Sequence, residues 1–111
     1  MTGAALTRKL TLETRVRLED GGGGAGEAWS ELGALWAEVL PRAAAERIYG
    51  GVRASLVTHR IRMRWLPYGD PARPVAGQRL RDGARAYEVL GVTEADPHNI
   101  LLQVWAREVA L

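Results

Sequence analysis

The stretch VTHRIRMRW, residues 57–65, constrains the fold of this chain more than any other feature, because two kinds of residue alternate along it. Side chains that follow one another along a β-strand point to opposite faces of its sheet. The alternation therefore predicts a strand over about 56–66 with one buried face. The buried face would hold Val57, His59, Ile61, Met63 and Trp65, and the opposite face Thr58, Arg60, Arg62 and Arg64.

Two segments before this one also carry strand signals. Residues 8–20, RKLTLETRVRLED, place Leu10, Leu12, Val16 and Leu18 on one parity, which predicts a half-buried strand. Residues 28–41, AWSELGALWAEVLP, show a mixed periodicity. We predict an extended strand over Leu32–Val39, with Trp29 packing at its start and Pro41 ending it.

Three more strand-like segments follow residues 57–65. Asp82–Gly83 is a tight-turn dipeptide between two strand-like segments, and the residues that follow it, RAYEVL, alternate in polarity. The closing segment, 100–111, carries apolar residues at both parities, which indicates a central or covered strand.

Glycine, proline and alanine mark the connections. The run Gly21–Gly24 predicts a flexible loop, and three prolines within 67–77 exclude a helix and a strand ladder there. Ala43–Arg47 are good helix formers ahead of Gly50–Gly51, so a short helix is expected between the second and third strands. The sum is a single domain, 1–111, that is mainly β: a small antiparallel barrel or sandwich of five or six strands.

Charge and composition narrow the function. The chain has 15 basic and 13 acidic residues and a net charge of +2, a balance too even to indicate a nucleic-acid binder by itself. It has no cysteine, which excludes disulfides and thiolate metal sites. The start of the sequence lacks the apolar block of a signal peptide, and no apolar run approaches the length of a membrane span, so synthesis in the cytoplasm is expected.

The search for reactive groups finds no candidate. His59 and His98 have no metal-ligand spacing, and Ser30 and Ser55 lie outside a nucleophile motif. The glycine run lacks the Gly-Lys-Ser/Thr ending of a phosphate-binding loop. No catalytic, cofactor-binding or metal-ligating residue is therefore predicted, and we do not expect an enzyme.

The arginine face leaves three interpretations open. Its side chains would be spaced by about 6.6–6.8 Å, close to the separation of phosphates along a nucleic-acid strand. Single-strand binders, however, interleave aromatic residues with basic ones on the same face, and Trp65 lies on the other parity. A solvated face, or one paired with Glu13, Glu38 or Glu88 on other strands, is favoured first, a protein interface next and direct DNA contact last.

The order of these signals resembles that of the head–tail joining proteins of long-tailed bacteriophages, the small head-closure or stopper proteins that also occur in prophages and gene transfer agents. A Trp-Ala tract ahead of a proline is followed by a glutamate, a Thr-His strand and an Asp-Gly turn with a later tyrosine. The matching residues are Trp36–Ala37, Pro41, Glu46, Thr58–His59, Ile61, Met63–Arg64, Asp82–Gly83, Tyr87 and Val89.

The resemblance implies a structural role without chemistry. The subunit would form a homo-oligomeric ring, a hexamer or dodecamer, in the neck of a virion or phage-like particle after assembly in the host cytoplasm. The ring would sit between a portal-bound adaptor and the tail terminator or tail tube, and would close or narrow the channel through which double-stranded DNA passes. No membrane is involved. The alternative is an OB-like β-barrel that binds nucleic acid.

Two sets of residues follow from this interpretation. Residues 42–54 are expected to point toward the channel or an adjacent ring. The ring or partner interface is predicted to include Arg60, Arg62, Arg64, Arg42, Glu46, Arg47 and Arg53. The core signature is predicted to be Trp36, His59, Ile61, Met63, Trp65, Tyr87 and Val89.

Overall fold

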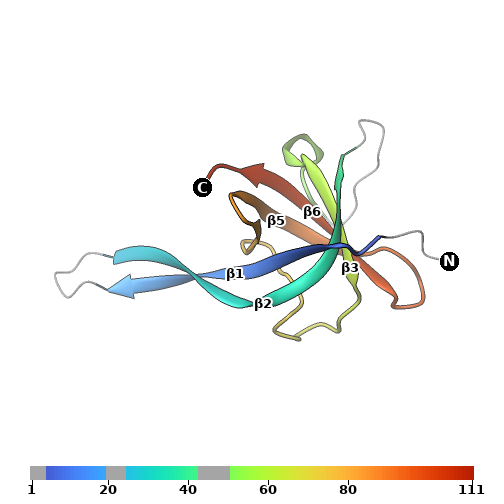
Figure 1. Ribbon diagram of the computed structural model, residues 1–111, viewed down its shortest axis with the longest axis horizontal. Helices are drawn as coiled ribbons and strands as arrows, with labels where there is room; N and C mark the ends of the chain where they lie inside the picture. The colour runs from blue at the N-terminus through green and yellow to red at the C-terminus, as the bar shows by residue number, and fades with distance from the viewer. Residues whose placement is uncertain (1–4, 20–24, 43–50) are drawn as a thin grey trace.

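Six antiparallel strands form one sheet that closes into a barrel in the computed structural model, which describes residues 5–19, 25–42 and 51–111 (Figure 1). The order around the barrel is β1-β2-β3-β6-β5-β4. The elements are β1 (Arg8–Glu19), β2 (Ala25–Pro41), the 3₁₀ turn η1 (Ala54–Leu56), β3 (His59–Arg64), β4 (Arg79–Asp82), β5 (Arg85–Glu94) and β6 (Leu101–Val109). The predicted fold class is confirmed. Residues 43–47 of the predicted helix and the glycine run lie outside the described residues.

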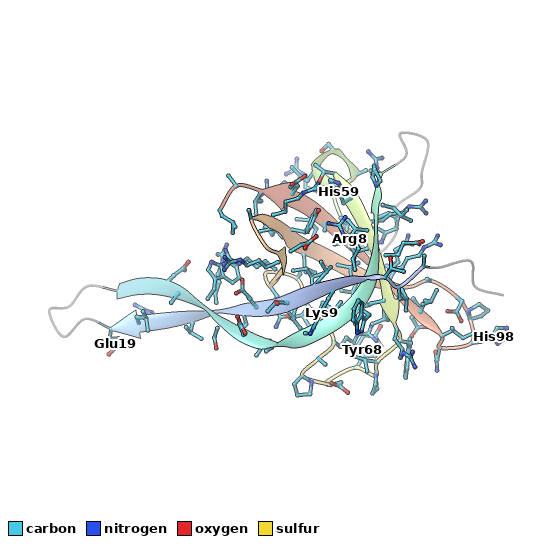
Figure 2. All side chains as sticks on the ribbon, in the orientation of Figure 1. Arg8, Lys9, Glu19, His59, Tyr68 and His98 are labelled. Carbon is cyan, nitrogen blue, oxygen red and sulfur yellow. The ribbon has the colours of Figure 1, made fainter. Side chains whose placement is uncertain are left out.

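A long hairpin of β1 and β2 leaves the barrel (Figure 1). The barrel closes where Thr11, Leu12 and Glu13 pair with β4, and beyond Glu13 strand β1 pairs with β2 alone. The projecting part comprises 14–19 and 25–30, and Glu19 lies at its far end (Figure 2). The molecule is accordingly elongated, with extents of 54 × 27 × 26 Å.

A β-bulge marks the point of departure. Leu12 pairs with Gly33 and Glu13 pairs with Glu31, so Leu32 is an extra residue in β2. Gly33 has φ = +144°, a conformation that side chains rarely adopt. Because β1 supplies a partner on both sides of the bulge, β2 begins seven residues before the predicted strand. Trp29 therefore lies within β2, opposite Arg15, and not at its start.

The core fills the barrel with the inward residues of all six strands. Its buried members are Leu10, Leu12, Ala37, Ile61, Met63, Leu80, Tyr87, Val89, Leu102, Val104 and Ala106. The apolar parity predicted for 8–20 is buried only as far as Leu12. Val16 is half-buried and Leu18 is 53% exposed, because the hairpin has left the barrel before these residues.

The closing strand β6 lies between β3 and β5 and is buried on both faces, as its sequence indicated. Trp105 on its outer face is buried and donates from Nε1 to Thr93 Oγ1 at 3.0 Å. Gly91, its partner in β5, is covered by the segment before β3: a Cβ on Gly91 would lie 2.4 Å from Val52 Cγ2. A side chain at Gly91 would therefore require the side chain of Val52 to move.

The Asp82–Gly83 prediction is confirmed as a tight turn between β4 and β5. Asp82 pairs with Arg85, and Gly83 adopts φ = +58° between them. The residues between β3 and β4 contain no strand, as their prolines indicated. In the part of the chain that the structure describes, no helix has the length and apolarity needed to cross a membrane.

Candidate assembly surface

The three arginines of β3 lie on the outer face of the barrel, opposite Ile61 and Met63 in the core. Arg64 is exposed, whereas Arg60 and Arg62 are half-buried between the neighbouring strands. Arg62 pairs with Glu38 of β2 and Gln103 of β6, and its Nε donates to Gln103 Oε1 at 3.1 Å. The strand thus presents a row of guanidinium groups on the surface.

The acidic residues expected to pair with this row have other partners. Glu13 binds Arg79 and Arg81, and Glu88 accepts a 2.6 Å hydrogen bond from Arg107. Glu38 Oε2 accepts a hydrogen bond from the backbone N–H of Ala5 at 3.0 Å. Arg62 and Arg64 form no ion pair with these three acids, although Glu38 is the register partner of Arg62.

The other predicted interface residues belong to the connection between β2 and β3. Arg42 is half-buried just after β2, and its backbone N–H donates to the Thr58 carbonyl at 3.0 Å. Arg53 is exposed immediately before η1. Glu46 and Arg47 lie outside the described residues. The described members thus lie where the chain enters the arginine strand.

Most of the predicted core signature lies inside the barrel, but Trp36 does not. Ile61, Met63, Tyr87 and Val89 are buried, and Trp65 is half-buried against the core. Trp36 is 56% exposed. Its neighbours Leu35 and Ala37 occupy the inward parity of β2, so its side chain faces out. The prediction that Trp36 belongs to the core is wrong.

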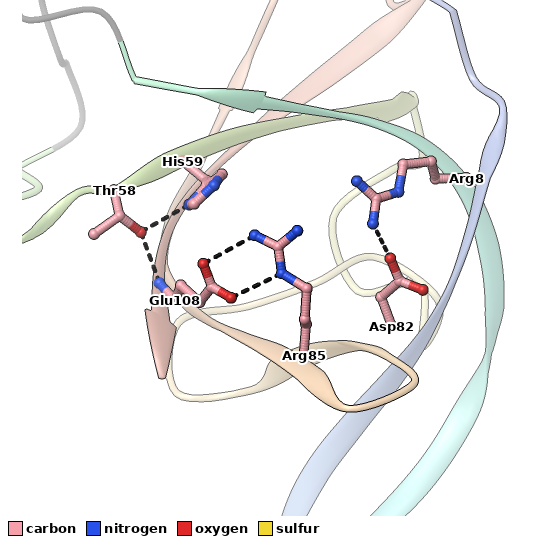
Figure 3. A network of polar contacts seen from close by, with 6 residues as sticks. All are labelled: Arg8, Thr58, His59, Asp82, Arg85 and Glu108. Atoms are coloured by element: carbon pink, nitrogen blue, oxygen red, sulfur yellow. Dashed lines mark hydrogen bonds and ion pairs between the residues drawn. The ribbon is translucent and has the colours of Figure 1, made fainter. Parts of the chain in front are cut away.

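A polar network closes one end of the barrel (Figure 3). Arg85 donates from Nε and Nη2 to Glu108 at 2.8 and 3.0 Å, and these bonds hold the pKa of Glu108 below its ordinary value. Thr58 Oγ1 accepts the backbone N–H of Glu108 at 2.7 Å and lies 2.9 Å from His59 Nδ1. Arg8 and Asp82 form an ion pair beside them. One group of contacts links the ends of β3, β5 and β6, and the neighbouring ion pair links β1 and β4.

His59 is half-buried within this end of the barrel. Its ring meets Tyr87 edge to face, with centroids 5.1 Å apart, and burial lowers its pKa from the ordinary 6.5. Burial also raises the pKa of Tyr87. His59 is therefore a packing residue that stays neutral at pH 7.

The lowered pKa of His59 predicts a fall in stability in mild acid. The unfolded chain takes up the proton near pH 6.5, while the folded chain takes it up only at lower pH. Stability should therefore be complete above about pH 6.5 and decline as pH falls through the folded pKa. Urea unfolding between pH 7 and 5 measures this. His59→Gln should flatten the decline, and an unchanged slope in that variant would exclude His59 as its source.

A second charged cluster, which the sequence did not reveal, lies at the base of the hairpin. Arg79 Nε donates to Glu13 Oε1 at 2.6 Å, although Glu13 is only 4% exposed. The guanidinium of Arg79 also lies 4.1 Å from the centroid of Trp29, and that of Arg15 lies 5.2 Å from it. This cluster links β1, β2 and β4. In the sequence, the only sign of this cluster is an acidic residue, Glu13, within a strand. Which residues bind Glu13 depends on how β1 pairs with β2 and β4.

An apolar groove of about 720 Å³ was also not predicted. One wall is the middle of β2, where Leu32 is 41% exposed, and the other includes Met63, Arg64 and Leu66. The remaining lining residues are Leu6, Thr7, Leu12, Gly33, Ala34, Leu35, Trp36 and Ala72. The apolar run LGALW was its visible signal in the sequence.

These features suit contact with another macromolecule. Within the described ranges, no three His, Asp or Glu side chains are grouped to hold a metal ion. The surface offers exposed arginines, exposed apolar side chains and a groove, which are the elements of a protein interface.

Comparison with known proteins places this surface in context. The model of a family described as phage head completion protein matches residues 1–109. A chain in the virion of a native gene transfer agent particle is 36% identical, with a TM-score of 0.71, and the match covers 96% of this chain and 98% of that one. A solution structure of a Shigella flexneri 2a protein is similar in fold: 24% identity, TM-score 0.73, and coverage of 97% and 96%. No curated protein matches at a significant level.

Proposed function

The chain belongs to the phage head completion protein family, and from that premise we propose that it is a ring-forming subunit of the head–tail connector. The observation that carries the proposal is the 36% identity, over nearly the full length of both chains, to a chain of a gene transfer agent virion. The domain, 1–111, acts as one unit that closes or narrows the DNA exit and docks the tail. Its role is structural.

The ring requires two different patches on each subunit, because a heterologous interface joins one patch to another on the next copy. The arginine row of β3 supplies one patch, since Arg64 is exposed and neither it nor Arg62 forms an ion pair with Glu13, Glu38 or Glu88. We expect acidic groups of a neighbouring subunit or of the adaptor to meet it. A hexamer or dodecamer stands between the portal-bound adaptor and the tail terminator or tail tube.

The segment 42–54 is proposed to face the channel or the adjacent ring, where it meets DNA or a partner. Cross-linking of an assembled particle tests this placement. Cross-links from Arg53 to the adaptor or to DNA support it, whereas labelling of Arg53 by solvent probes in the complete particle contradicts it.

Nucleic-acid binding by the isolated barrel is the competing function. A titration with DNA across salt concentrations separates the two. Micromolar or tighter binding that falls steeply with salt would favour the competing function. No binding by the free subunit, with ring formation on partner complexes, favours the connector.

Charge reversal at Arg62 should impair assembly before it affects folding. Arg62→Glu places a carboxylate next to Glu38 and opposes any acidic partner, so the yield of complete particles should fall about tenfold or more. Electron microscopy of particles from cells that carry the variant gene counts tailed particles. Arg62→Lys keeps the charge and should assemble normally. A folded Arg62→Glu subunit that builds particles at the normal yield would contradict this role.

A further inference from the structure

Both strands of the projecting hairpin have an open edge. Strand β1 pairs with β4 only at 11–13, so its outer edge has no strand partner among the described residues over 14–19. Strand β2 pairs with β3 only from Ala37 onward, so its outer edge is likewise open over 25–36. An open strand edge presents unpaired N–H and C=O groups and is a template for another strand.

The two open edges differ in charge: that of β1 carries two arginines with Glu19 at its end, and that of β2 carries two glutamates. Arg15 and Arg17 lie on one face of β1, and Glu27 and Glu31 lie on the same face of β2. All four are exposed, and the single ion pair described among them, between Arg15 and Glu27, is long at 3.9 Å. The basic edge and the acidic edge are therefore complementary surfaces that are not used up within one chain.

The other face of the hairpin carries apolar side chains beyond the pair Thr14 and Ser30. It continues the inner face of the barrel through Val16 and Leu18 on β1 and Ala28 on β2. Beside the open edge of β2 lies the apolar groove, which is lined by Leu32 and Trp36 among others. Leu18, Leu32 and Trp36 are each more than 40% exposed. A strand added to this edge would cover apolar surface as well as backbone groups.

We propose that the occupant of the β2 edge is the β1 edge of a second copy of this chain, so that the hairpins of neighbouring subunits join into one antiparallel sheet. If successive copies have the same orientation, β1 of one copy runs antiparallel to β2 of the next, because β1 and β2 are antiparallel within each copy. A register with Arg17 opposite Glu27 of the neighbour places Arg15 opposite Trp29, diagonal to both Glu27 and Glu31. Val16 and Leu18, on the opposite face of β1, then add apolar contacts to the joined sheet. Because a different edge is used on each side, the contact is heterologous and suits a closed ring.

This inference rests on the proposed ring and is tested with charge-swapped hairpins. One variant, R15E/R17E, makes both edges acidic, and a second, E27R/E31R, makes both edges basic. The fourfold variant R15E/R17E/E27R/E31R exchanges the two edges, keeps the net charge and serves as the matched control. Thermal melts establish that each variant folds. Tailed particles are then counted in producing cells that lack the natural gene and carry one variant or a pair.

Each double variant alone should lower the yield by on the order of 100-fold, because like charges face each other at every contact. The two expressed together should restore it, and the fourfold variant alone should restore it too. Double variants that assemble normally would overturn the inference and leave the connector function standing. Loss in both double variants with no rescue in the mixture or the fourfold variant would assign the edges to a different protein.

If the unaltered chain does not restore particles, the connector function fails and sedimentation decides the inference. A mixture of the folded double variants that forms oligomers, while each alone stays monomeric, supports hairpin pairing. A mixture that stays monomeric overturns it.

Discussion

Replacing Glu13 with alanine should lower the free energy of unfolding by about 3–5 kcal/mol, the usual effect of removing one partner from a buried ion pair. Glu13 is 4% exposed, and the side chain of Arg79 that binds it is 14% exposed. Without the carboxylate, the guanidinium of Arg79 would keep its place against Trp29 but lose the only acidic side chain described as binding it. The loss falls where β1 pairs with β4, so it weakens the closure of the barrel itself. Urea unfolding of the two proteins measures the difference.

The matched control is Glu27→Ala on the same hairpin. Glu27 is 70% exposed and lies 3.9 Å from Arg15, and exposed pairs of this kind contribute less than about 1 kcal/mol. Both variants remove one carboxylate, so the difference between their losses of stability measures the effect of burying the ion pair. Equal losses in the two variants would show that Glu13 is not a buried counter-charge for Arg79.

The strands could be predicted because period-2 alternation is local. The arginine strand keeps one partner on each side, so its parity alone separates Ile61 and Met63 from the arginines. The Asp82–Gly83 turn is equally local, since its signal is the conformation that Gly83 must adopt. Features that depend on one strand or one turn could therefore be predicted from the sequence.

The projecting hairpin could not be predicted, because it depends on pairing between distant strands and not on local alternation. Whether Val16 and Leu18 are covered depends on how far β4 extends along β1, and no periodicity in β1 carries that information. In β2 the bulge at Leu32 inverts the parity, with Ala28 on the apolar face before it and Leu35 and Ala37 inward after it. This inversion explains the mixed periodicity of 28–41. The core placement of Trp36 came from the family resemblance, whereas the register of β2 turns this residue outward.

For the interface residues, the sequence predicted which face of the strand they occupy but not which residues they contact. Alternation placed Arg62 and Arg64 outside, but the partners of Glu13, Glu38 and Glu88 depend on the register of three other strand pairs. These acids bind other groups and form no ion pair with Arg62 or Arg64. The short pairing of β1 with β4 and of β2 with β3 also leaves the edges of the hairpin open. Both candidate surfaces therefore arise from how the barrel closes.

Truncation of Tyr87 to alanine should be as damaging as the loss of Glu13, at about 3–5 kcal/mol. The side chain is fully buried, and its ring packs edge to face against His59 and beneath the guanidinium of Arg85 at 5.4 Å. The cavity would open next to the polar contacts that link β3, β5 and β6 at this end of the barrel. Chemical unfolding gives the loss.

Tyr87→Phe separates packing from the hydroxyl. The hydroxyl oxygen is buried and has no hydrogen-bond partner in the described part of the chain. Removing an unsatisfied buried hydroxyl should leave stability unchanged or raise it by up to about 1 kcal/mol, because its desolvation is no longer a penalty. The phenylalanine ring keeps both aromatic contacts. A loss above about 1 kcal/mol in Tyr87→Phe would instead show that the hydroxyl holds this end of the barrel together, through a bond that the ring alone cannot replace.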